Sequence, residues 1–297
     1  MLVVDELPLC PGYRDARLID VVDGVARYGA VEMGTGRPVV LKIVDMHAPP
    51  YLREALDGEA AILAALGSHP NIITMYQRVE TVDGRRGVAL ERCLGSAAQL
   101  FRFTPTPAPQ AIAFAVKLAG ALETAHRSGV LHCRVRPQNM LLSEYYEPVL
   151  ANFESAVRLG DPAHSPPLLH NPNVHTAPEL LLGDPATEAT DVYGLAATLY
   201  ELVVGHGPFR SYQNDSPATI STRVLCDDIA PLSDASVPPD LSDLVLWALA
   251  REPGARPPSP VWFAEELGRI EQLNGWRRSS FLIRQADAPS VRIDRLG

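Results

Sequence analysis

Short apolar runs separated by Gly, Pro and charged residues fill the first third of the chain and predict β-strands. Within this region, residues 51–68 carry apolar side chains every three or four positions, which predicts a helix. The predicted strands span 17–23, 25–33, 38–46, 71–80 and 85–93.

The pattern changes to helical spacing after Gly95, so the chain divides into a small β-rich lobe and a larger helical lobe. The predicted fold is therefore α+β and bilobal, with a cleft near 91–96. Helices are predicted at 109–129, 187–205, 239–250 and 260–273, and short strand pairs near 140–143 and 148–152. The predicted parts are an N-terminal extension (1–16), lobes at 17–92 and 93–274, and an Arg-rich segment (275–297), which is either a tail or a loosely docked extension.

Composition narrows the class of protein. The 297 residues are 46% hydrophobic and 21% charged, as in a soluble globular protein, and the formal net charge of -9 attracts no nucleic acid. The four cysteines show no CxxC spacing, so neither a disulfide framework nor a zinc site is expected. Since no signal peptide and no run of about 20 apolar residues is present, we expect a cytoplasmic protein without a membrane span.

Two charged residues fall at positions that the pattern marks as buried. Lys42 shares a strand face with Val40 and Val44, and Glu59 falls on the apolar stripe of the helix predicted at 51–68. An isolated buried charge is unfavourable, so opposite charges in neighbouring elements are expected to meet. The alternative is that each side chain extends to solvent from a partly open edge.

Asp191 begins an apolar helix and allows two interpretations. It is either a simple helix N-terminal carboxylate or a buried carboxylate that accepts hydrogen bonds from the backbone of another loop.

Seven motifs between residue 17 and about residue 273 resemble those of Hanks-type Ser/Thr protein kinases, and they occur in the family's order. They are VVLKIV, Glu59 with the following AILAALGSHPNI, GVLHCRVRPQNMLL, VLANFESA, TAPELLLG, ATDVYGLAATLYEL and REPGARP. The resemblance implies the bilobal protein-kinase fold: a small antiparallel β N-lobe with one helix and a mainly helical C-lobe. The amino-acid sequences of these segments are most similar to those of bacterial kinases, especially actinobacterial ones.

The catalytic positions depart from the family's pattern. His132, Cys133 and Arg134 stand where the family has His-Arg-Asp. The Asp accepts the substrate's hydroxyl proton, which an always-protonated arginine cannot do. Arg136 replaces the lysine that reaches the γ-phosphate.

The metal-binding positions are also altered. Asn152 replaces the metal-binding Asp and Glu154 replaces the glycine two positions later, while the second metal ligand, Asn139, is kept. A neutral amide is a poorer Mg²⁺ ligand than a carboxylate, so the resemblance implies weak metal binding at Asn139 and Asn152. Glu154 is an alternative carboxylate donor.

The nucleotide-binding positions are only partly kept, which leaves ATP binding open. The family's three loop glycines align with Gly24, Ala26 and Gly29, and Val40 stands where the family has Ala over the adenine. The cofactor-binding positions that the resemblance implies are Lys42, Glu59, Gly24, Gly29, Val31, Val40, Glu91, Cys93, Asn139 and Leu141.

Residues that support the fold in the family are retained. Leu63, Met75, His132 and Phe153 match a hydrophobic spine resting on Asp191. Glu179 is expected to pair with Arg256. The activation segment, 152–179, loses two partners together, since Cys133 removes a phosphate-binding arginine and Pro172 replaces a Thr or Ser.

The resemblance and its departures together predict a pseudokinase that regulates an active kinase or scaffolds a signalling complex. The alternatives are a weak or unconventional Ser/Thr kinase that uses Asn139, Glu154 and Arg136, and a nucleotide sensor without turnover. Candidate docking surfaces are 206–230 and the Arg-rich segment. Ser279 and Ser280 follow two arginines and match the sites of kinases that prefer basic substrates.

Overall fold

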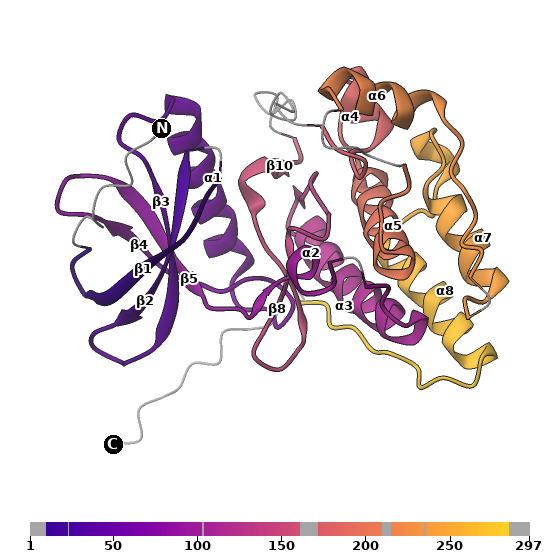
Figure 1. Cartoon of the computed structure of the whole chain (residues 1–297), viewed down its shortest axis with the longest axis horizontal. Coiled ribbons are helices and arrows are strands. Elements are labelled where there is room, and N and C mark those ends of the chain that lie inside the picture. Colours follow the sequence, from indigo (N-terminus) through magenta and orange to yellow (C-terminus); the bar gives the residue numbers. More distant parts are fainter. Residues whose placement is uncertain are drawn as a thin grey trace.

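The computed structural model describes residues 10–284 apart from 23, 103, 161–171, 210–214 and 235. Figure 1 shows a sheet-containing N-lobe, drawn in indigo, and a helical C-lobe, drawn from magenta to yellow. This arrangement confirms the predicted α+β, two-lobed architecture. Within the described ranges, no helix combines the length and apolar character that crossing a bilayer requires.

The N-lobe is built on a five-stranded antiparallel sheet in the order β1-β2-β3-β5-β4. The strands are β1 (Tyr13–Val22), β2 (Val25–Glu32), β3 (Pro38–Val44), β4 (Met75–Glu80) and β5 (Arg86–Glu91). The helix α1 (Pro50–Leu66) buries Leu56, Glu59, Leu63 and Leu66, which confirms the predicted stripe.

The N-lobe starts earlier than the sequence pattern indicated. The boundary predicted at residue 17 lies inside β1, which begins at Tyr13. The ring of Tyr13 is buried, and its hydroxyl accepts a hydrogen bond from Gln77 Nε2 at 2.6 Å. Residues 14–17 follow this anchor into the strand, although Ala16 is the only apolar residue among them.

The C-lobe consists mainly of helices. They are α2 (Ala97–Leu100), α3 (Ala108–Arg127), α4 (Pro178–Leu182), α5 (Glu188–Val204), α6 (Pro217–Cys226), α7 (Pro239–Ala248) and α8 (Pro260–Leu273). Short strands and 3₁₀ turns connect them: β6 (Gly95–Ser96), β7 (Val130–Leu131), β8 (Met140–Leu142), β9 (Pro148–Leu150), β10 (Val157–Arg158), η1 (Phe153–Ser155) and η2 (Pro253–Ala255). The long helices agree with the predicted ranges, whereas α2, α4 and α6 were not predicted because they are short or largely exposed.

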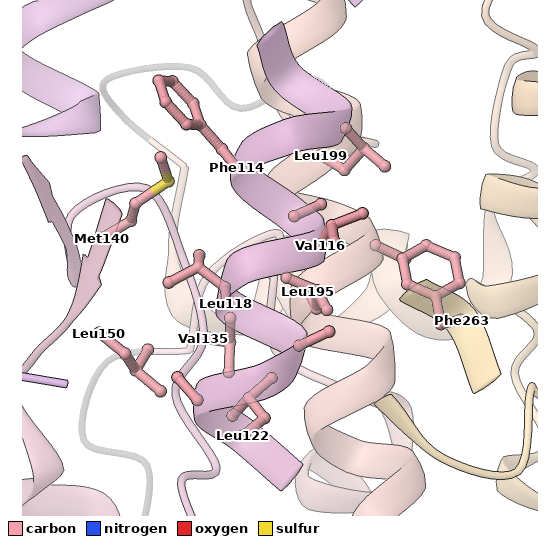
Figure 2. Packing of buried hydrophobic residues seen from close by; sticks show 14 of the residues in the cluster. Phe114, Val116, Leu118, Leu122, Val135, Met140, Leu150, Leu195, Leu199 and Phe263 are labelled. Atoms are coloured by element: carbon pink, nitrogen blue, oxygen red, sulfur yellow. The ribbon is translucent and has the colours of Figure 1, made fainter. Parts of the chain in front are cut away.

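The C-lobe core lies between α3 and α5, which are buried around most of their circumference. Figure 2 shows α3 with Leu118 on the side that faces Val135 and Leu150, and Leu195 of α5 and Phe263 of α8 on the opposite side. A helix that is apolar on all sides needs neighbours on all sides, which the surrounding helices provide. This core supports the two loops, 132–139 and 152–154, that form the candidate site.

Candidate active site

The predicted meeting of Lys42 and Glu59 is confirmed. Lys42 Nζ on β3 lies 2.6 Å from Glu59 Oε2 on α1, and both side chains are almost fully buried. Burial alone would lower the pKa of Lys42, but the charges of Glu59 and Glu154 outweigh it and raise that pKa. Lys42 therefore remains charged, and its bond to Glu59 fixes α1 against the sheet.

The loop after β9 docks on this pair through its backbone. Asn152 adopts a left-handed conformation (φ 70°), which an asparagine tolerates better than most residues. This turn directs the Phe153 N–H toward Glu59, whose Oε1 accepts it at 3.0 Å. Asn152 Oδ1 in turn accepts a hydrogen bond from Lys42 Nζ at 2.7 Å.

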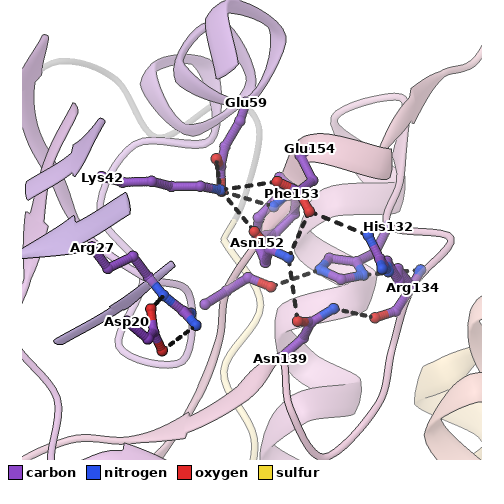
Figure 3. Close-up of polar contacts among 11 residues, drawn as sticks. Asp20, Arg27, Lys42, Glu59, His132, Arg134, Asn139, Asn152, Phe153 and Glu154 are labelled. Carbon is purple, nitrogen blue, oxygen red and sulfur yellow. Dashed lines mark hydrogen bonds and ion pairs between the residues drawn. The ribbon is translucent and has the colours of Figure 1, made fainter. Parts of the chain in front are cut away.

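Glu154 joins two cations from opposite lobes. Its Oε2 lies 3.2 Å from Lys42 Nζ, and its Oε1 lies 3.2 Å from Arg134 Nη1. Burial would raise the pKa of Glu154, but the neighbouring Lys42 and Arg134 lower it, so the group is an anion. Figure 3 shows the carboxylate between the two cationic groups. Lys42 thus has two carboxylate partners, Glu59 and Glu154.

The amides of Asn139 and Asn152 bond to each other, and Asn152 also bonds to the ammonium group of Lys42. Asn152 Nδ2 donates to Asn139 Oδ1 at 3.3 Å and to Glu154 Oε1 at 3.0 Å, and Asn139 Nδ2 donates to Arg134 O at 2.8 Å. Their oxygens are therefore engaged, with Lys42 and Arg134 close by. A hard divalent cation prefers charged oxygens, so these two neutral amides are poor ligands for Mg²⁺.

The predicted phosphate-binding loop is a tight turn, because Val22 pairs directly with Val25. Ala26 and Gly29 therefore lie within β2, paired with β3. Gly24 O accepts from Asp45 N at 3.3 Å, and a Cβ at Gly24 would lie 3.1 Å from Leu52 on α1. The turn is consequently packed against the start of α1.

Arg27 occupies the strand position opposite Lys42, and its guanidinium is held by Asp20 of β1. Arg27 Nε and Nη2 donate to the two Asp20 carboxylate oxygens at 2.6 and 2.7 Å. Figure 3 shows this pair on the N-lobe side of the site. Asp20 was not predicted from the sequence, since a bidentate partner across a hairpin depends on the strand register.

The residues expected around an adenine come from both lobes. Val31 and Val40 are half-buried on neighbouring strands, and the Glu91 N–H donates to Thr74 O at 2.9 Å. Cys93 and Leu141 pack against the main core cluster. Burial raises the pKa of Cys93 to about 12, so its thiol is neutral and behaves as a small apolar group. Nucleotide contact at these positions remains a prediction.

Asp191 is a buried carboxylate that accepts hydrogen bonds from the backbone of another loop, which was one of its two predicted interpretations. Its Oδ2 accepts from the backbone N–H of His132 at 2.8 Å, and its Oδ1 accepts from that of Cys133 at 2.7 Å. His126 Nε2, which the sequence analysis did not single out, donates to Asp191 Oδ2 at 2.7 Å. Asp191 therefore fixes the loop that carries Arg134.

The expected spine is present around His132. The Phe153 ring meets the His132 ring edge to face, with centroids 4.7 Å apart, and His132 Nε2 donates to Ala151 O at 3.1 Å. Leu63 and Phe153 share one core cluster, and Met75 packs against it. The spine thus connects α1 to the loop that Asp191 holds.

The predicted Glu179–Arg256 pair is confirmed and is bidentate. Arg256 Nη1 and Nη2 donate to the Glu179 oxygens at 2.8 and 2.7 Å, and both side chains are buried. Thr190 Oγ1 donates to Glu179 Oε1 at 2.8 Å, and the Tyr193 ring lies 4.9 Å from the Arg256 guanidinium. Of the activation segment predicted at 152–179, residues 161–171 lie outside the described residues.

Comparison with known proteins decides the family. The model of the protein kinase domain matches residues 24–267. The chain belongs to the protein kinase family. It is 30% identical over 250 residues to the serine/threonine-protein kinase PknK of Mycobacterium tuberculosis, covering 84% of this chain and 22% of PknK. It is 28% identical over 254 residues to the serine/threonine-protein kinase PknL of the same organism, covering 82% of this chain and 62% of PknL. The chain thus spans about a fifth of PknK and under two thirds of PknL.

Proposed function

We propose that this protein kinase domain transfers no phosphate and acts as a regulatory or scaffolding module for an active kinase or another signalling protein. The proposal rests mainly on Glu154, whose carboxylate joins Lys42 to Arg134. The lysine that would contact a nucleotide phosphate already has two carboxylate partners. The position of the family's catalytic base carries a fixed positive charge that cannot accept a proton.

The second candidate is a weak or unconventional Ser/Thr kinase, because the named relatives are serine/threonine-protein kinases. The retained Lys42–Glu59 pair and the spine through His132 and Phe153 support it. Positioning and charge stabilisation supply most of the rate enhancement in phosphoryl transfer, so a retained framework favours residual activity. A third candidate is a nucleotide sensor without turnover, which would bind ATP through the retained framework but lacks the catalytic base that Arg134 replaces.

Titration of ATP with and without Mg²⁺ separates these candidates. Melting temperature and transfer of labelled phosphate, to the chain itself and to a basic acceptor protein, are measured in the same samples. We expect no transfer in either condition. A nucleotide sensor would gain ~2.7 kcal/mol of stability at a hundredfold excess over Kd, whereas a pure scaffold would gain none.

The two lysines of the sequence provide a matched pair of variants for this experiment. Lys42 lies in the site, and Lys117 on α3 forms an ion pair with Glu147. Transfer that persists in Lys117→Met and disappears in Lys42→Met would establish the weak kinase and overturn the proposal. Transfer unaffected by both variants would indicate a contaminating kinase.

Replacing Glu154 by glycine, the residue of the family at this position, is expected to strengthen Mg²⁺-free ATP binding. The change removes the anion that pairs with Lys42 and Arg134 and leaves both cations available to phosphate oxygens. We expect Kd to fall about tenfold, equivalent to about 1.4 kcal/mol. A fluorescent ATP analogue measures this change.

Glu154→Gln serves as the control, since it keeps the size of the side chain and removes its charge. It is expected to reproduce part of the gain in affinity. Equal Kd values for the original chain and both variants would show that Glu154 does not restrict the site.

A further inference from the structure

Residues 275–284, here called the C-terminal strap, run back across the domain after α8. Figure 1 shows this stretch in yellow, leaving the end of α8 and passing α3 toward the N-lobe. Trp276 and Phe281 pack against the main core cluster, and Trp276 N donates to Glu271 O at 2.8 Å. The strap therefore docks along the C-lobe. This agrees with the second of the two predicted alternatives, a docked extension. Residues 285–297 lie outside the described residues.

Two glycines inside helices make room for the strap. A Cβ at Gly120 of α3 would lie 2.5 Å from Leu282 O, and a Cβ at Gly268 of α8 would lie 3.0 Å from Arg278 Nε. Glycine destabilises a helix interior relative to alanine, so its presence at these two positions needs a compensating reason. Close approach of the strap supplies that reason and indicates a groove shaped for it.

A buried carboxylate holds the middle of the strap. Glu271 is 1% exposed, and its two oxygens accept from the backbone N–H of Ser279 at 2.6 Å and from Ser279 Oγ at 2.7 Å. Arg278, the preceding residue of the strap, forms an ion pair with Glu265. The hydroxyl of Ser279 thus touches an acidic group that has little access to solvent.

The far end of the strap reaches the helix that carries Glu59. Leu282 O accepts from His69 Nε2 at 3.1 Å, shortly after α1, and Arg284 N donates to Thr124 Oγ1 at 3.1 Å. The Arg284 guanidinium donates to Leu66 O at the C-terminus of α1, where a cation complements the unpaired carbonyls. The strap therefore links α8 to α1 without passing through the candidate active site.

We propose that Ser279 is a phosphorylation site and that its phosphate detaches the strap from the C-lobe. Arg277 and Arg278 directly precede it, in a segment without regular structure, and provide the positive charge that an acidic substrate groove recognises. A phosphate on Oγ faces the buried Glu271, and like charges at hydrogen-bonding distance repel each other. This inference does not depend on whether the chain itself transfers phosphate.

The modification is carried out by a separate Ser/Thr kinase that uses ATP. Brief opening of the strap frees Ser279 Oγ from Glu271, and the attack forms the Oγ–P bond. The bond between the γ-phosphorus and the oxygen bridging it to the β-phosphate breaks, the hydroxyl proton passes to the base of the modifying kinase, and ADP leaves. The added charge then prevents the strap from returning to its groove.

The test treats the full chain with ATP and a Ser/Thr kinase that prefers arginine before the acceptor. Mass spectrometry locates the phosphate, and hydrogen exchange follows the amides of 276–284 and 65–73. We expect phosphate on Ser279 and at least tenfold faster exchange in both stretches. Ser280→Ala is expected to behave identically, whereas Ser279→Ala is expected to take no phosphate there and to show the same exchange with and without the kinase treatment.

A steric variant tests release without phosphate. Gly120→Ala places a methyl group against Leu282 O and is expected to accelerate exchange in the same two stretches. Gly58→Ala, at a helical glycine of α1 where an added Cβ would have no neighbouring atom within 4 Å, is expected to leave exchange unchanged. Phosphate on Ser280 alone, no phosphate on Ser279, or a phosphorylated Ser279 with slow exchange would each overturn the proposal.

Discussion

Replacing Glu179 by glutamine is expected to lower the free energy of unfolding by about 3–5 kcal/mol. The substitution leaves the Arg256 guanidinium buried without its counter-charge, since the Arg256 side chain is fully buried in the C-lobe. Arg256 also donates to Ala189 O, Ala250 O and Arg251 O, so it cannot turn toward solvent without breaking these bonds. Urea denaturation followed by circular dichroism measures the loss.

A partly exposed pair provides the comparison for this variant. Glu123 and Arg127 are spaced four residues apart on α3, with half of the Arg127 side chain exposed. Glu123→Gln is expected to change stability by less than about 1 kcal/mol, because solvent screens such pairs. Similar losses for the two variants would contradict the structural role given to Glu179.

The second large effect is expected at Asp191. Asp191→Asn keeps the shape of the side chain, but an amide offers one acceptor where the carboxylate offers two. At least one N–H among those of His126, His132 and Cys133 then faces an NH₂ group. Each buried donor left unpaired costs about 1–3 kcal/mol, so we expect a loss of roughly 3 kcal/mol. Asp240→Asn, at an exposed position in the first turn of α7, is the control.

This difference in stability is expected to depend on pH in a defined window. Burial would raise the pKa of Asp191, but its hydrogen bonds, above all the one from His126, lower that pKa. The stability that ionised Asp191 contributes is therefore present above about pH 4 and is lost as the pH falls through the lowered pKa of the folded state. Burial would lower the pKa of His126, but the hydrogen bond and charge of Asp191 raise that pKa. The stability that protonated His126 contributes is therefore present below about pH 6.5 and is lost as the pH rises through the raised pKa of the folded state. The gap between the original chain and Asp191→Asn is therefore expected to be widest between about pH 4 and 6.5. A gap that is constant from about pH 3 to 9 would contradict the Asp191–His126 contact.

The fold and the ion pairs could be predicted because their signals are local or periodic. The phase of Glu59 on the stripe of α1 and of Lys42 on β3 indicated a meeting of the two as one of two alternatives, and the structure confirms it. The kinase motifs predicted the Glu179–Arg256 pair across a long sequence separation. The helix α8 begins at Pro260, as predicted, since proline is favoured in the first turn of a helix and Ser259 caps it.

The role of Glu154 could not be predicted from the sequence. Its reach to both Lys42 and Arg134 depends on the left-handed backbone at Asn152, which no periodicity encodes. The buried Ser279–Glu271 contact likewise depends on the path of the strap over Gly120. Such contacts join segments whose relative placement is decided by tertiary packing, and local propensity carries no information about them.

The cluster of Lys42, Glu59, Arg134 and Glu154 has a consequence for the rate at which an anion arrives. Lys42 and Arg134 contribute two positive charges and Glu59 and Glu154 two negative ones, so this cluster has no net charge. Electrostatic steering requires an uncompensated charge, and its hallmark is an association rate that falls steeply as salt is added. These four groups therefore add no net attraction for an approaching polyphosphate, and we expect them to add little to the dependence of its association rate on ionic strength.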